Sequence, residues 1–185
     1  EEVAELTRAV NLTGEALAHV AGLLQPGIWE DQIKAHYIHY LSMQGRGPRF
    51  RSVVAAAKNA TVLHYNDAQY QCQDGDMVLM DVGAGSNWYV SDVTRTLPVS
   101  GKFTPRQREI YDIVYEALEI GLDTIRVGIS EDVVNTAIRK HYAQALKAIG
   151  LITEARDVEK YYFHGSGHPI GLDLHDLRDA DKIIT

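Results

Sequence analysis

The 185-residue sequence contains a single cysteine and no long apolar stretch. One cysteine, Cys72, can form neither a disulfide within the chain nor a thiolate metal site, because both need several cysteines. No uninterrupted apolar run approaches the length of a bilayer span, and the opening Glu1-Glu2-Val3 is not a signal peptide. We therefore expect a cytoplasmic protein without a membrane partner.

Basic residues are also in short supply. Lysine and arginine number 18 against 25 aspartates and glutamates, which gives a formal net charge of −7. Nucleic acids and anionic membranes both favour basic surfaces, so neither is expected as a partner. The apolar share of 45% is that of an ordinary folded protein, and the length suits one domain.

Helical and strand-like segments alternate along the chain. Apolar residues recur at three- and four-residue steps in the helical segments, and Thr104-Pro105-Arg106-Gln107 forms a capping box with proline at the first helical position. The region between Phe50 and Val99 has strand-like runs broken by turn residues, so the fold class is α+β. Helices are expected over roughly residues 3–24, 30–43, 104–118 and 130–149.

The chain nearly repeats itself. Gly27-Ile28-Trp29-Glu30-Asp31 returns about a hundred residues later as Gly128-Ile129-Ser130-Glu131-Asp132, and each copy lies between two predicted helices. Each helix pair leads into a segment with a histidine, His64 and then His164. This order predicts a duplicated α–β unit, with one repeat at about 1–100 and another at about 104–185. The second repeat is the shorter, so we expect the chain to be incomplete at its C-terminal end.

Two aspartates flank a predicted β-hairpin. Residues 77–82 and 88–99 are apolar and β-prone, with a short polar turn between them. With Ser86-Asn87 as the turn residues, Asp81 and Asp92 would face each other, with Cβ atoms roughly 4.5–5.5 Å apart. Two ionised carboxylates at that distance repel, so one takes up a proton or a cation lies between them.

Another reading of the aspartates stays open at this point. Asp81 and Asp92 could be strand-end residues whose carboxylates are capped by Thr94, by Thr96 or by backbone amides.

Three of the eight histidines, His164, His168 and His175, fall within twelve residues and are interleaved with glycines. The glycines and Pro169 exclude an ordinary helix. Imidazoles in such a setting suit the close approach of a substrate backbone or a metal ion. Taken alone, each of them is better explained as an incidental surface-loop or core histidine, and His64 as a core or loop residue.

These segments resemble, in order, those of the pita-bread metallopeptidases of the aminopeptidase P type. The resemblance covers essentially the whole chain and implies an α+β pita-bread fold, in which a duplicated unit surrounds a curved antiparallel sheet. The segments are Leu63-His64-Tyr65, Leu79-Met80-Asp81-Val82-Gly83, Ser91-Asp92-Val93-Thr94-Arg95-Thr96, His164-Gly165-Ser166-Gly167-His168 and His175-Asp176.

The resemblance implies hydrolysis of the bond between an N-terminal residue and a following proline, by a hydroxide that bridges two divalent metal ions. Mn²⁺ is expected first, with Co²⁺ or Zn²⁺ as alternatives, because the ligands are mostly oxygens with one imidazole. Substrates would be peptides with proline in the second position, and we expect a homo-oligomer. The resemblance assigns Asp81, Asp92 and His168 as metal ligands. It places His64, His164 and His175 around the substrate, as catalytic residues.

The chain departs from the family pattern at its end. The family has two further glutamate ligands, and the stretch from Leu177 to Thr185 contains no glutamate. We therefore expect the 185-residue chain alone to have little peptidase activity and weak metal affinity.

Three other functions are weighed against an Xaa-Pro aminopeptidase. An Xaa-Pro dipeptidase fits the sequence nearly as well. A non-catalytic pita-bread module that binds peptide or protein, or a metal-independent hydrolase similar to creatinase, would be expected to lose the aspartates. The presence of both Asp81 and Asp92 therefore favours the metal-dependent peptidases.

Overall fold

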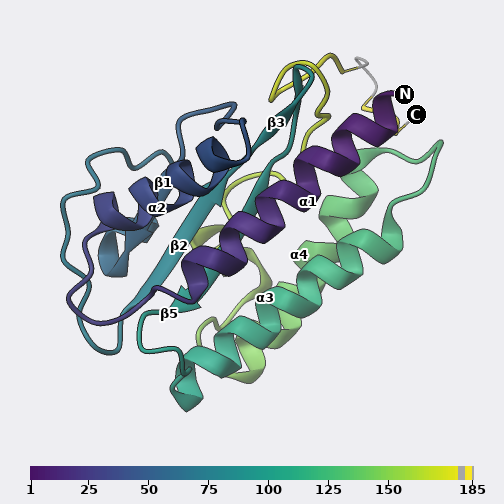
Figure 1. Cartoon of the computed structure of the whole chain (residues 1–185). Coiled ribbons are helices and arrows are strands. Elements are labelled where there is room, and N and C mark those ends of the chain that lie inside the picture. The colour runs from purple at the N-terminus through teal and green to yellow at the C-terminus, as the bar shows by residue number, and fades with distance from the viewer. Residues whose placement is uncertain (179–181, 185) are drawn as a thin grey trace. The chain divides into compact units, whose positions relative to one another are not determined.

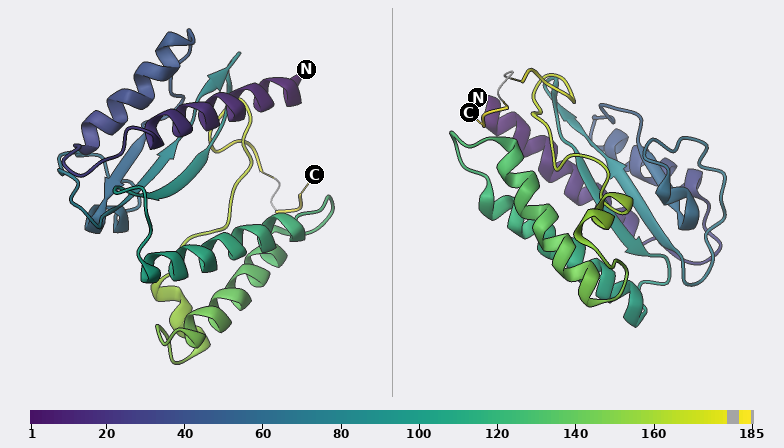
Figure 2. Two further views of the ribbon diagram at one scale, coloured as in Figure 1. Left: turned by 60° about the horizontal axis from the view of Figure 1, so that its bottom comes forward. Right: turned by 180° about the vertical axis from the view of Figure 1, so that it is seen from behind.

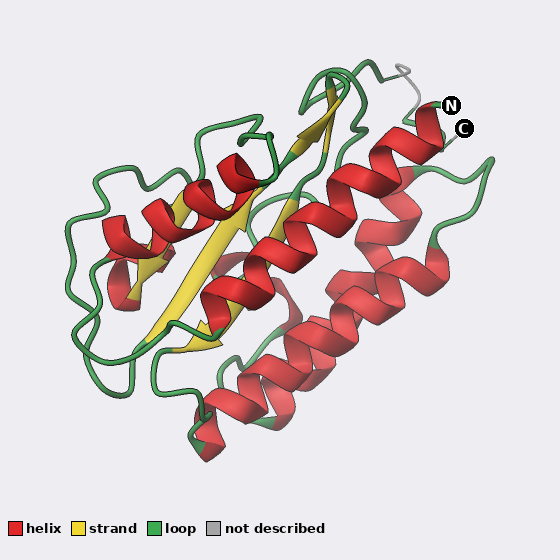
Figure 3. Cartoon of the chain, viewed as in Figure 1, coloured by secondary structure: helices red, strands yellow, loops and turns green. Residues whose placement is uncertain are grey.

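The computed structural model describes residues 1–178 and 182–184 of the chain. It divides into two compact units, which are described separately. The first unit combines Glu1–Phe103 with the later segment Ile170–Asp176. The second unit combines Thr104–Pro169 with the described residues that follow Asp176. Figure 1 labels the α-helices and the longer strands, Figure 2 gives two further views, and Figure 3 colours the chain by secondary structure.

The first unit is a small antiparallel sheet with two helices on one face (Figures 1 and 3). The short 3₁₀ helix η1 follows the first strand, and the two shortest strands form a hairpin of their own. The helices are α1 (Glu2–Ala21) and α2 (Glu30–Met43), and η1 covers Ala57–Thr61. The three-stranded sheet has the order β1 (Val53–Ala56), β2 (Met77–Val82) and β5 (Val93–Pro98), and the hairpin pairs β3 (Gly85–Ser86) with β4 (Tyr89–Val90).

The core of the first unit lies between the helices and the sheet. Strand β2 alternates, so Val78, Met80 and Val82 are buried in the same cluster as the apolar faces of α1 and α2. The residues between them, including Leu79 and Asp81, are half-buried on the opposite face of the strand. Asp81 is therefore held on the sheet face that points away from α1 and α2.

The pairing of β2 with β5 differs from the sequence expectation by two residues. Asp81 lies opposite Thr94, whereas direct opposition to Asp92 was expected. That expectation was wrong because the ladder ends at Val82 and Val93, so Asp92 lies just outside it. A two-residue shift preserves the alternation of a strand, so it does not transfer a side chain to the other face.

The shift originates in the turn. The turn residues are Asn87 and Trp88, rather than Ser86 and Asn87, and both have positive φ, 44° and 76°. Two consecutive positive φ angles match the twist of a two-residue hairpin loop. A tryptophan in this conformation is uncommon, since side chains larger than glycine rarely adopt it.

The second unit is a helical hairpin of α3 (Pro105–Thr124) and α4 (Glu131–Ala148), with the 3₁₀ helix η2 (Ala155–Lys160) packed against α4. The expected capping box is confirmed, because the Thr104 hydroxyl accepts from the Gln107 amide and the Gln107 side chain accepts from the Thr104 amide. The Ser130 hydroxyl caps α4 by accepting from the Asp132 amide. Among the described residues, every helix is too short or too polar to span a bilayer.

The two repeated five-residue segments, 27–31 and 128–132, make equivalent backbone hydrogen bonds. Gly27 N donates to Cys72 O, Cys72 N to Ile28 O, and Glu30 N to Tyr70 O. In the second unit Gly128 N donates to Ile184 O, Ile184 N to Ile129 O, and Glu131 N to Lys182 O. Gly27 and Gly128 also share a positive φ, 95° and 90°. We propose that the chain contains a duplicated α–β unit, and the shared hydrogen bonds and positive φ angles support this.

Candidate metal centre

Asp81 and Asp92 lie beside each other in the first unit. The pKa of Asp81 is raised, first because burial disfavours its charged form and second because the charge of Asp92 lies close to it. A hydrogen bond between the two carboxyl groups acts in the same direction. In the protein alone, Asp81 therefore holds a proton more readily than an isolated aspartate would.

Two neighbours counteract this effect. The Thr94 hydroxyl donates a hydrogen bond to Asp81 Oδ1 over 3.1 Å, and the charge of His64 also lowers the Asp81 pKa. The capping by Thr94 that the sequence left open is thus present, and it coexists with the contact between the two carboxyl groups. A site that needs added positive charge to ionise fully is suited to a divalent cation.

The approach of Asp92 to Asp81 depends on Gly83. A β-carbon on Gly83 would overlap the carbonyl oxygen of Ser91 and the ring of Phe50. Glycine thus lets the chain segments that carry the two aspartates come together just beyond the ladder.

The residue before Asp92 is fixed to the core. The buried Ser91 hydroxyl shares a hydrogen bond of 2.7 Å with the Thr13 hydroxyl of α1. The amide of Ala84 donates to both hydroxyls, over 2.9 Å to Thr13 and 3.0 Å to Ser91. This buried network anchors the backbone from which the Asp92 side chain projects.

His64 lies in the loop between η1 and β2, and its side chain is exposed. Its neighbours attach the loop to the rest of the first unit. The hydroxyl of Tyr65 donates to Glu30 Oε2 over 2.9 Å, and an Arg51 nitrogen donates to the Asn66 carbonyl over 3.3 Å. Glu30 was not identified as a site residue from the sequence.

His175 is carried by the short segment Ile170–Asp176, which belongs to the first unit. The Val90 amide of β4 donates to the Gly171 carbonyl over 2.9 Å, and the Leu172 amide donates to Asp176 Oδ2 over 3.2 Å. The His175 side chain is exposed.

His164 and His168 belong to the second unit. The ring of His164 lies 5.3 Å from that of Tyr162, and its Nδ1 is 2.7 Å from the Gly165 carbonyl. Nδ1 of His168 is 3.0 Å from the Pro169 carbonyl. A carbonyl oxygen only accepts, so Nδ1 is the donor in each of these two contacts.

The first unit thus brings together Asp81, Asp92 and the charge of His64, and it also contains His175. Within the described residues, no three side chains of histidine, cysteine, aspartate or glutamate form a ready-made metal site. The convergence of His168 on the aspartate pair, and the roles of His164 and His175, remain predictions.

The chain is similar in sequence to known metallopeptidases. The sequence profile of metallopeptidase family M24 matches residues 4–183. The Xaa-Pro aminopeptidase of Escherichia coli (strain K12) is 35% identical over 198 residues, which cover 100% of this chain and 44% of that protein. Xaa-Pro aminopeptidase 2 of Streptomyces coelicolor is 33% identical over 189 residues, which cover 97% of this chain and 40% of that protein.

Among solved structures, zinc-substituted Escherichia coli aminopeptidase P in complex with product matches with a TM-score of 0.91 and 34% identity. The match covers 96% of this chain and 42% of that one. The α+β pita-bread fold expected from the sequence is confirmed by this likeness. The chain spans less than half the length of each of these relatives.

Proposed function

Because the chain belongs to metallopeptidase family M24, we propose that it carries part of the active site of a metal-dependent aminopeptidase. The reaction would be hydrolysis of the peptide bond between an N-terminal residue and a following proline. The observation that carries the proposal is the contact between Asp81 and Asp92 in a setting where burial and then the Asp92 charge raise the Asp81 pKa. Such a pair is costly to ionise without a cation, so it suits metal binding better than a purely structural role.

The residues fit divalent metal ions in their donor chemistry. Asp81 and Asp92 would hold the metal through their carboxylate oxygens, and His168 would add an imidazole nitrogen. This oxygen-rich set with one nitrogen favours Mn²⁺ or a similar ion, and we propose two such ions. When bound, the ions would act as Lewis acids and make water nucleophilic at neutral pH.

The histidines would act on the substrate. His64, carried on a loop attached through Tyr65 and Asn66, would orient the peptide beside the aspartate pair. His164 and His175 would donate hydrogen bonds to the charge that develops on the carbonyl oxygen during hydrolysis. Groups aimed at developing charge raise kcat more than they tighten substrate binding.

The preference for proline is proposed from the relatives, which are named Xaa-Pro aminopeptidases. An Xaa-Pro dipeptidase would use the same ligands on substrates of only two residues. Peptide length therefore separates the two reactions.

The experiment is an assay of the intact protein with added Mn²⁺ on three synthetic peptides. One is a tripeptide with proline second, one has alanine in that place, and one is the Xaa-Pro dipeptide. Release of the first residue from the proline tripeptide alone, abolished by EDTA and by Asp92→Asn, is the expected result. Cleavage of the dipeptide alone would favour the dipeptidase, and cleavage of neither proline peptide would favour a non-catalytic binding module.

A further inference from the structure

A fully buried carboxylate lies outside the aspartate pair. Glu30, the first residue of α2, is 0% exposed. Charged residues are almost never fully buried unless their charge is compensated. Here two neutral donors contact each oxygen. Ala56 N (2.7 Å) and Asn59 Nδ2 (3.1 Å) donate to Oε1, while the Tyr65 hydroxyl (2.9 Å) and Tyr70 N (3.0 Å) donate to Oε2.

All four donors come from one stretch of chain, residues 56–70, which carries His64. Ala56 ends β1, and Tyr70 lies in the later part of the connection to β2, so Glu30 contacts both the start and the later part of that connection. The Glu30 amide also donates to the Tyr70 carbonyl over 3.0 Å. One carboxylate therefore constrains the path of the chain from Ala56 to Tyr70.

The contact with Tyr65 is the one nearest to His64. The Tyr65 hydroxyl donates to Glu30 and accepts from Asn59 Nδ2 over 3.0 Å, so three side chains bond to one another in a closed triangle. His64 directly precedes Tyr65, and its own side chain is exposed. The position of its imidazole thus depends on the backbone that Tyr65 anchors.

The second copy of the repeated segment, residues 128–132, shows that a helix can begin in this way without burying its glutamate. Glu131 occupies the place of Glu30 and makes the equivalent backbone bond. Its side chain is partly exposed and pairs with Arg178, at 3.3 Å. Of these two helix starts, the one in the unit that carries His64 buries its glutamate among four neutral donors, and the other does not.

We propose that Glu30 is a positioning residue, which acts through Tyr65 to hold His64 in place beside the Asp81–Asp92 pair. The role of His64 in this inference rests on the proposed peptidase function. The holding of the loop by Glu30 does not, and it can be tested separately.

The test uses Tyr65→Phe, which removes one hydroxyl and keeps the ring. Its matched control is Tyr70→Phe, which removes a tyrosine hydroxyl from the same connection. That hydroxyl donates to Asp76 over 3.1 Å rather than to Glu30. Glu30→Gln is the direct variant, but it places an amide NH₂ against N–H and O–H donors and can prevent folding. The tyrosine pair keeps the test decisive in that case.

The first measurement is made without metal or substrate, by NMR relaxation of the backbone amides of His64 and Tyr65. In Tyr65→Phe, the order parameters should fall from about 0.85 towards 0.6 or below, while Tyr70→Phe keeps wild-type values. The melting temperature should fall by about 2–4 °C in Tyr70→Phe, which loses one hydrogen bond, and further in Tyr65→Phe, because the Tyr65 hydroxyl also accepts from Asn59 and Gln69. Unchanged order at His64 in Tyr65→Phe would overturn the inference.

The second measurement is steady-state kinetics of the intact protein on an Xaa-Pro tripeptide. Tyr65→Phe should lower kcat about 10- to 100-fold with KM within about twofold, and Tyr70→Phe should leave both unchanged. A loss of order without a loss of kcat would overturn the link to catalysis. If the wild-type protein cleaves no Xaa-Pro peptide, the proposed function fails, and the anchoring of His64 is decided by the NMR result alone.

Discussion

Asp81 lies directly across the sheet from Thr94, whose hydroxyl donates a hydrogen bond to Asp81 Oδ1 over 3.1 Å. The bond opposes the effects of burial and of Asp92 on the Asp81 pKa. It also fixes the orientation of the carboxyl group on the strand. Thr94 is thus an outer partner of the candidate ligand Asp81.

Replacement of Thr94 by valine should weaken metal binding. The variant keeps the shape of the side chain and removes the donor, so the Asp81 carboxylate is less ionised and less well oriented. Loss of an outer partner typically costs 10- to 100-fold in affinity, and about 10-fold is expected here. Calorimetric titration of the intact protein with Mn²⁺ measures it. Thr96→Val, two residues further along β5, is the control, and equal affinities in both variants would contradict the assignment.

The metal-free protein should be stabilised by Asp81→Asn at neutral pH. Burial and Asp92 raise the folded-state pKa of Asp81, so the folded protein binds that proton more tightly than the unfolded chain does. The resulting stability is present below the unfolded pKa of about 3.9 and is lost as the pH rises through the raised folded pKa. Asparagine has no carboxyl group to ionise, so the Asp81→Asn variant does not lose this stability as the pH rises. Solvent screening at the half-exposed Asp81 limits the gain in melting temperature to about 2–4 °C at pH 7.

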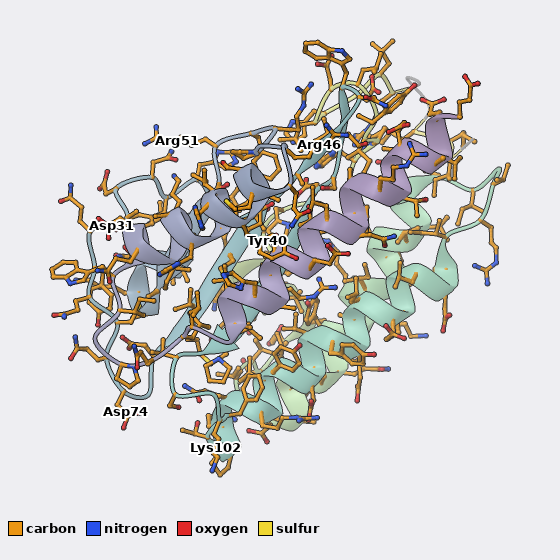
Figure 4. All side chains as sticks on the ribbon, viewed as in Figure 1. Asp31, Tyr40, Arg46, Arg51, Asp74 and Lys102 are labelled. Carbon is orange, nitrogen blue, oxygen red and sulfur yellow. The ribbon has the colours of Figure 1, made fainter. Side chains whose placement is uncertain are left out.

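Melting curves in EDTA at pH 7 and pH 3.5 check this sign, because the two proteins should converge at the lower pH. The control is Asp74→Asn at an exposed turn (Figure 4), which should melt like the wild type at both values. A lower melting temperature for Asp81→Asn at pH 7 would show that the ionised carboxylate stabilises the fold.

Gly83→Ala should be severely destabilising. The added methyl group overlaps the Ser91 carbonyl and the Phe50 ring, and backbone cannot move aside as a flexible side chain can. A cost of about 3 kcal/mol or more is expected for such overpacking. Gly14→Ala within α1 meets nothing within 4 Å and should stabilise by about 0.5–1 kcal/mol. Urea denaturation measures both, and a similar effect of the two substitutions would refute the close approach at Gly83.

The histidines should separate into ligands and substrate-contacting residues. In the intact protein, His164→Ala and His175→Ala should lower kcat about 10²- to 10³-fold while the metal content stays near that of the wild type. His168→Ala should instead lose metal. Elemental analysis alongside kinetics distinguishes the classes, with His36→Ala, an exposed residue of α2, as the control. Metal loss in His164→Ala or His175→Ala would make those residues ligands.

The sequence predicted the elements well where the signals are local. The start of α3 could be predicted because its capping box is formed by residues within one helical turn. Helix α2 begins and ends where the sequence pattern indicated. The hairpin register was not readable, since it depends on a tryptophan with positive φ and on the close contact at Gly83. Turn preferences do not predict either feature.

The candidate site was predicted unevenly for the same reason. Asp81 and Asp92 could be paired because they lie on one hairpin. Glu30 was missed because its partners lie from 26 to 40 residues away, and two of them are backbone amides, which leave no trace in side-chain patterns. A glutamate at the start of a helix usually signals only a favourable interaction with the helix dipole.

The hydrogen bond from Val90 to Gly171 has a consequence for biosynthesis. The two residues are 81 positions apart, so β4 leaves the ribosome long before its partner exists. At about 5–20 residues per second, this interval lasts roughly 4–16 s. The α3–α4 hairpin, held by local contacts, can form meanwhile. The unit that is translated first is therefore completed late, and during this interval its β4 edge is exposed to chaperones and to other nascent chains.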